Sequence, residues 1–150
     1  MRELILSGEN LNSLLDTLLN REHSCSVKVF CKGFSMSPFI KDSDSIIIRP
    51  VEKTADLKIG DIVAVAVSRG KIIIHRIIRL EKKFFMLKGD NLTYDDGWFG
   101  KQDVIGIVEI VFKKNNFRYK PDPLINYVIA IGSRTKILNH LLAFFRRFTR

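Results

Sequence analysis

Cysteine is scarce in this chain of 150 residues, and its two thiols cannot form a disulfide framework. Cys25 and Cys31 lie in a stretch typical of a strand, which would separate them by about 20 Å at roughly 3.3 Å per residue. A disulfide needs a much shorter separation. A reducing compartment is therefore the simpler expectation.

Long apolar runs are absent as well. The start of the chain has no extended apolar region behind Arg2, so we expect neither a cleavable signal peptide nor an N-terminal membrane anchor. Arg134 and Lys136 interrupt the apolar stretch at residues 124–148, and neither half reaches the roughly 20 residues that span a bilayer. We therefore expect no membrane-spanning segment.

Residues suited to binding a metal or a cofactor are also few. His23, His75 and His140 are widely separated, and no Cys/His spacing resembles a zinc site. No glycine-rich phosphate loop is present. We predict that the protein binds no metal and no cofactor.

Acidic residues are the minority: 25 Lys and Arg stand against 16 Asp and Glu, which leaves a net charge of +9. The excess is uneven, because residues 113–150 contain nine basic residues and one acid, whereas residues 1–112 are nearly neutral. The hydrophobic fraction of 46% is enough for one domain with its own core. The composition predicts a nearly neutral body followed by a basic tail.

Hydrophobic periodicity divides the chain into three parts. Residues 1–24 carry leucines at helical spacing and predict a helix: Leu11, Leu14, Leu15, Leu18 and Leu19. Residues 25–120 contain short β-type runs separated by turns, at 27–30, 46–48, 62–67, 72–80, 84–87 and 104–112. We predict a mostly β fold: an antiparallel β-body with an N-terminal helix and a C-terminal helical tail, residues 121–150.

The predicted tail is amphipathic and basic. Its apolar face consists of Ile137, Leu138, Leu141, Leu142, Phe145 and Phe148, and Lys136, His140, Arg147 and Arg150 fall on the other face. We expect peripheral attachment to an anionic membrane surface through residues 121–150, with a cytoplasmic location as the alternative. The roughly 25 residues before the β-body are too few for a helix-turn-helix domain, so we predict no specific nucleic-acid partner.

One serine of the β-body lies in a setting that favours chemistry. Ser35 is in a tight turn that ends at Pro38, where Phe34 and Met36 can anchor the turn in the core and leave the hydroxyl presented. A serine hydroxyl becomes a useful nucleophile only beside a base that a third group holds in place.

Residues that suit these two supporting roles follow along the chain. His75 interrupts the apolar strand at 72–78, and Asp90, Asp95 and Asp96 lie in the loop after the next strand. Histidine is suited to act as the base, and a loop carboxylate is suited to orient it. Taken singly, each residue is better explained as an ordinary turn or strand residue, and only the set of three suggests chemistry.

Five segments of the chain resemble, in order, the motifs of the type I signal peptidase family. They are residues 33–38, 57–63, 74–77, 88–91 followed by 95–96, and 103–108. Histidine at position 75 is similar to the archaeal and endoplasmic-reticulum branch of that superfamily, whereas the other branches carry lysine there.

The resemblance implies a mostly β serine protease with Ser35 as nucleophile, His75 as general base and Asp96 as orienting acid. It implies a structural or electrostatic role for Asp90. It further implies cleavage of a signal or leader peptide after a small side chain, with the peptide or preprotein bound in extended form. Whether a partner subunit supplies the membrane anchor that this family carries stays open from the sequence.

Two positions depart from the family pattern. Gly33 stands where many members have a serine that supports the oxyanion, so backbone amides around Ser35 would have to take that role. Ser43 stands where the family has glycine, which costs backbone freedom at that turn.

Two other functions remain open from the sequence. A soluble cytoplasmic protease that trims the leader of a ribosomally made peptide would use the same residues without a membrane anchor. A non-catalytic β-module would bind an anionic membrane surface through the tail and would not use Ser35 chemically.

Overall fold

The computed structural model of the chain describes residues 26–51, 57–67 and 71–135. Its strands are β1 (Val27–Phe30), β2 (Ser45–Pro50), β3 (Ile62–Val67), β4 (Lys71–Leu80), β5 (Phe84–Lys88), β6 (Gly97–Gly100), β7 (Val104–Phe112) and β8 (Arg118–Tyr119). A short 3-10 helix, η2 (Lys101–Asp103), precedes β7, and an α-helix, α2 (Pro123–Arg134), follows β8. The helix predicted within residues 1–24 and the amphipathic pattern at 136–150 lie outside the described residues.

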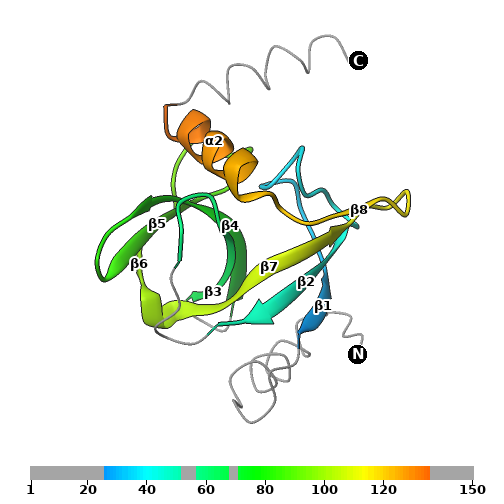
Figure 1. The fold of residues 1–150 in the computed structure, drawn as a ribbon, viewed down its shortest axis with the longest axis horizontal. Coiled ribbons are helices and arrows are strands. Elements are labelled where there is room, and N and C mark those ends of the chain that lie inside the picture. The colour runs from blue at the N-terminus through cyan, green and yellow to red at the C-terminus, as the bar shows by residue number, and fades with distance from the viewer. Residues whose placement is uncertain (1–25, 52–56, 68–70, 136–150) are drawn as a thin grey trace.

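The described strands form one antiparallel sheet in the order β1-β2-β7-β3-β4-β5-β6, with β8 paired to β7. Register shifts in β2, β3 and β4 interrupt regular pairing, and such shifts bend strands. The sheet curls into a barrel-like shape (Figure 1). The predicted mostly β, antiparallel fold is confirmed. Strands β6 and β8 are additional, because a strand as short as β8 or as glycine-rich as β6 carries no alternating apolar signal.

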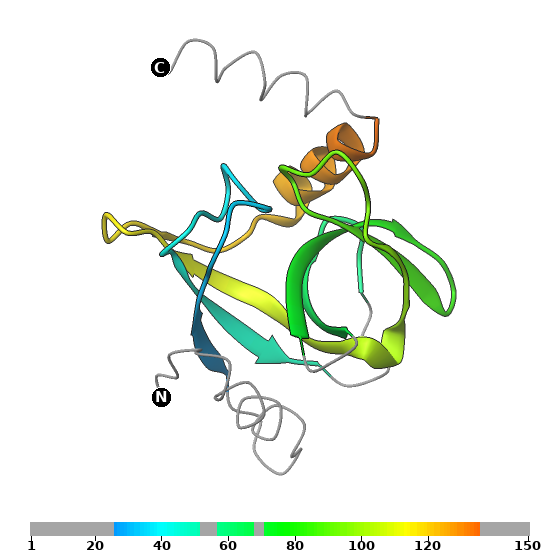
Figure 2. The same ribbon diagram turned by 180° about the vertical axis from the view of Figure 1, so that it is seen from behind.

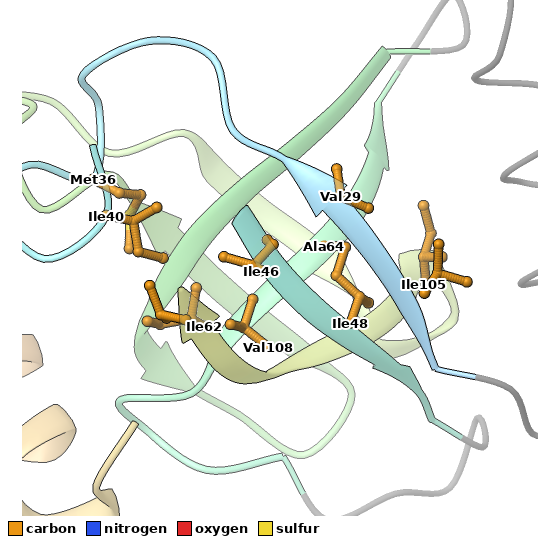
Figure 3. Close-up of a cluster of buried hydrophobic side chains, with 11 residues drawn as sticks. Val29, Met36, Ile40, Ile46, Ile48, Ile62, Ala64, Ile105 and Val108 are labelled. Carbon is orange, nitrogen blue, oxygen red and sulfur yellow. The ribbon is translucent and has the colours of Figure 1, made fainter. Parts of the chain in front are cut away.

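Two hydrophobic clusters fill the curled sheet, and β3 contributes to both. Ile62 and Ala64 belong to one cluster, whereas Val63 and Val65 belong to the other, as expected when successive side chains point to opposite faces. A strand buried on both faces needs a continuous apolar run, and β3 has one. Figure 3 shows the first cluster, in which Met36 and Ile40 from the turn after β1 pack with residues of β1, β2, β3 and β7.

Helix α2 packs on the β-body near β4. Asp122 caps its first turn by accepting a hydrogen bond from the Ile125 amide at 2.9 Å. Gly60 lies directly against the backbone of α2: a Cβ atom there would be 2.7 Å from both Asn126 C and Tyr127 N. Residues 123–134, the first half of the predicted tail, are thus packed on the sheet. In the described ranges, no helix has the length and apolar character needed to cross a bilayer.

Replacing Gly60 tests this packing. Gly60→Ala is expected to lower the free energy of unfolding by more than about 2 kcal/mol, because the methyl group overlaps the α2 backbone and because the residue has a φ of +101°. Gly97→Ala is the matched control, since Gly97 has a similar φ of +88° with open space around it. Backbone strain alone costs about 1 kcal/mol there. Equal losses in chemical denaturation would contradict the close approach of α2 to Gly60.

Candidate active site

The turn that carries Ser35 is held at both ends. Asp42 accepts a hydrogen bond from the Gly33 amide at 2.9 Å, and Met36 is buried in the core below the turn. Phe34, which we expected to be a second anchor, is instead 65% exposed, because the turn reverses after Gly33, whose φ is +96°. Of the two anchors expected on either side of Ser35, only Met36 is buried, and Ser35 remains partly exposed.

The structure brings Ser35, His75 and Asp96 together, although they come from three separate parts of the chain. The His75 Nε2 atom lies 2.9 Å from Ser35 Oγ. Its Nδ1 atom lies 2.6 Å from Asp96 Oδ2. The side chain of His75 is 8% exposed and that of Asp96 is 21% exposed.

These contacts fit one arrangement of protons for a neutral His75 beside an ionised Asp96. An ionised carboxylate can only accept, so the Nδ1 hydrogen of neutral His75 is donated to Asp96. The Nε2 lone pair is then free to accept the Ser35 hydroxyl hydrogen. This is the arrangement in which a serine can lose its proton to a base as it attacks.

Asp90 is not part of this cluster. Its carboxylate is fully buried and accepts two hydrogen bonds from Arg76, from Nε at 2.7 Å and Nη2 at 2.8 Å. Arg76 also donates to Gly60 O at 2.9 Å and to Asn126 Oδ1 at 2.8 Å. The paired charges and their hydrogen bonds make Asp90 a structural residue in this geometry.

The residues on either side of Asp90 contact the Ser35 turn directly. The Asn91 amide donates to Ser35 O at 2.8 Å, and its Nδ2 donates to Phe34 O at 2.9 Å. A Cβ atom at Gly89 would lie 2.7 Å from Ser35 O, so only glycine fits. Segment 89–91 therefore fixes the serine turn, and Figures 1 and 2 show both loops at the same end of the molecule as α2.

Sequence reasoning missed Arg76, Asn91 and Gly89 as parts of the site. A signal for Arg76 was present: it follows His75 in an apolar strand, and adjacent strand residues point to opposite faces. With both faces covered, at least one of these polar side chains must be buried and in need of partners. Gly89 and Asn91 lie in the motif-like segment 88–91, but the sequence did not show their roles, because their contacts are with backbone atoms far away in the chain.

The segment around Ser35 is also braced by the β7–β8 hairpin. Tyr119 donates a hydrogen bond to Phe39 O at 2.7 Å, and Lys113 Nζ donates to the same oxygen. Lys113 pairs in addition with Asp44, at 2.8 Å. Ser43, which stands where the signal peptidase pattern has glycine, has a φ of +68°, in the left-handed region that favours glycine.

A cleft of about 410 Å³ opens beside Ser35 and His75. Its walls are mainly apolar and include Val29, Phe30, Cys31, Met36, Ile40, Ile48, Ile72, Ile73 and Ile74. Burial raises the pKa of the Cys31 thiol to about 12, and the Asp44 carboxylate adds to this. The thiol therefore stays protonated at neutral pH and is not a competing nucleophile.

Two strand edges border this cleft. Among the described strands, β1 lies at the end of the sheet and pairs only with β2. The first half of β4 pairs with β3, whereas its pairing with β5 begins only at Arg76. Both walls thus offer backbone groups to a segment lying extended between them. The described residues contain no group of three His, Cys, Asp or Glu side chains placed to hold a metal ion.

One comparison with known proteins identifies a family. The family model described as Peptidase S24-like matches residues 6–112, well over half of the chain. A search of curated proteins found no significant match.

The Asp44–Lys113 pair makes stability depend on pH. Burial opposes the charge of Asp44, but hydrogen bonds from Lys113 and the Lys41 amide lower its pKa below the ordinary value. A carboxyl group whose pKa is lower in the folded state stabilises the fold at pH values above its ordinary pKa. This stabilisation is lost as the pH falls through the lowered pKa. Asp44→Asn is therefore expected to cost about 1 to 3 kcal/mol at neutral pH, with a smaller difference from wild type below about pH 4.

Urea denaturation across this pH range measures the effect, with the exposed residue Glu81 as control. Glu81→Gln should change stability little at any pH. A loss for Asp44→Asn that stayed constant down to strongly acidic pH would show that the charge of Asp44 does not stabilise the fold.

Proposed function

This chain belongs to the Peptidase S24-like family, and from that premise we propose that it is a serine endopeptidase with Ser35 as its nucleophile, His75 as general base and Asp96 as orienting acid. The observation that carries the proposal is the hydrogen-bonded series from Ser35 Oγ through His75 to Asp96, at 2.9 and 2.6 Å.

The proposed reaction follows from these contacts. Ser35 Oγ attacks the carbonyl carbon of the scissile peptide bond while its proton passes to His75 Nε2. Asp96 stabilises the resulting imidazolium through the Nδ1 hydrogen bond. The ring then gives its proton to the departing amine, which leaves an acyl group on Ser35. A water molecule, deprotonated by His75, hydrolyses that ester.

A donor for the tetrahedral oxygen is needed as well. Gly33 has no side chain to offer, which points to backbone amides. Within the described residues, the Ser35 amide donates no hydrogen bond to another group, and a nucleophile's own amide is a known oxyanion donor. We assign the Ser35 amide this role.

We propose that the substrate is a signal or leader peptide that binds in extended form and is cut after a small side chain. The apolar cleft beside Ser35 and the two strand edges along it support an extended apolar segment. The five segments that resemble type I signal peptidases support the leader-type substrate. In this proposal Asp90 acts through Arg76 and segment 89–91, and does not touch the substrate.

Substitution of the nucleophile tests the mechanism. Ser35→Ala is expected to lower peptide cleavage on the order of 10³-fold or more, because no other described group near His75 can form the acyl intermediate. Cleavage of a peptide mixture with small residues at many positions can be followed by mass spectrometry of the new termini. Ser37→Ala, in the same turn, is the matched control and should keep its activity. Equal cleavage by wild type and Ser35→Ala would sink the mechanism.

The choice among the aspartates has its own test. Asp96→Asn removes the acceptor that holds the Nδ1 tautomer of His75, and kcat should fall on the order of 10³-fold to 10⁴-fold. Its neighbour Asp95 is exposed and, among the described residues, accepts only from the Gly97 amide, at 3.1 Å. Asp95→Asn should therefore leave kcat within a few-fold of wild type. Comparable losses for the two variants would mean that Asp96 is not the orienting acid.

A further inference from the structure

Helix α2 turns two polar side chains inward, beside the apolar Ile129 and Ala130. Among its buried residues, Asn126 accepts from Arg76 Nη1 at 2.8 Å. Ser133 accepts from Lys88 Nζ through its carbonyl oxygen at 2.8 Å and its hydroxyl at 3.0 Å. Lys88 is itself buried. The inward face of α2 thus provides hydrogen-bond acceptors for two buried cations of the sheet, Arg76 and Lys88.

The outward face of α2 is apolar. Leu124 is 73% exposed, Ile125 60%, Val128 62% and Tyr127 48%. A helix on the surface of a protein in water normally turns its apolar residues inward. A contiguous apolar surface of this kind marks contact with a membrane or another protein.

The charge around α2 indicates which of these surfaces it meets. Lys120 lies just before the helix, with its Nζ atom 4.0 Å from Glu109 Oε1, and Arg134 lies in the last turn; both side chains are exposed. In the described residues 113–135 there are five basic residues and one acid. A second copy of this chain would bring the same positive charge against it, whereas anionic lipid headgroups would attract it.

We propose that the outward face of α2 inserts into the interface of an anionic lipid bilayer, with the flanking basic side chains at the headgroups. A helix that lies in the interface needs this combination of a continuous apolar face and cationic residues at its borders. The proposal goes beyond the peptidase activity and is independent of it, because none of the outward residues of α2 belongs to the Ser35 cluster.

The position of α2 gives this docking a consequence for the site. Thr93 and Asp95 line a small depression together with Ser133 and Arg134, so the loop that carries Asp96 lies beside the C-terminal end of α2. Tyr94, on the same loop, is 82% exposed. Docking through α2 therefore places the Asp96 loop close to the bilayer surface.

Vesicle binding by the full chain tests the proposal. Wild type should co-sediment with vesicles of phosphatidylglycerol and phosphatidylcholine in equal parts, and much less with phosphatidylcholine alone. The double variant Leu124→Ser/Val128→Ser should bind the mixed vesicles at least about tenfold more weakly, because two exposed apolar side chains no longer enter the interface. Phe84→Ser is the matched control: Phe84 is 49% exposed at the opposite end of β5 from Lys88, and this variant should bind as wild type does.

Because weaker binding by the double variant could also result from misfolding, a second variant measures insertion of α2 directly. Leu124→Trp in a Trp98→Phe background leaves tryptophan only at the proposed interface, and brominated acyl chains should quench its fluorescence. Ser35→Ala should bind vesicles as wild type does, which separates docking from catalysis. Undiminished binding by the double variant, absence of quenching, or a concentration-dependent dimer that the double variant abolishes would each overturn the proposal.

Discussion

The buried guanidinium of Arg76 is the interaction on which the architecture of the site depends. It is fully buried, and a buried charge is tolerated only when it is paired and its hydrogen bonds are satisfied. Its partners come from three places: the carboxylate of Asp90, the carbonyl of Gly60 and the amide of Asn126 in α2. One side chain thereby joins the turn before β3, the loop after β5 and the C-terminal helix.

The Ser35 cluster is linked to this buried pair through the chain itself. His75 precedes Arg76 in β4, so the placement of the guanidinium also sets the register of the imidazole. Asp90 lies between Gly89, which packs closely against Ser35 O, and Asn91, whose amide donates a hydrogen bond to Ser35 O. The Arg76–Asp90 ion pair therefore helps to position both Ser35 and His75 through the backbone of their neighbours.

The fold and the Ser35 cluster were predictable from the sequence to different degrees. The β-body followed from alternating apolar runs, since a half-buried or fully buried strand requires them. Ser35, His75 and Asp96 followed from motif resemblance, whereas the bonding partners of Asp90 did not. The exposure of Phe34 could not be predicted, because the φ of +96° at Gly33 redirects the turn and the sequence alone does not show which backbone conformation a glycine adopts.

By itself the sequence determined the longer strands, the nearly neutral body with its basic C-terminal part, and the residue types available for serine chemistry. These are local properties of period, composition and spacing. Only the tertiary structure decided that Asp90 pairs with Arg76, and that α2 turns Asn126 and Ser133 inward. Helical periodicity shows that a helix has two faces, but the side that faces inward depends on what lies beneath it, and here that is two buried cations, Arg76 and Lys88.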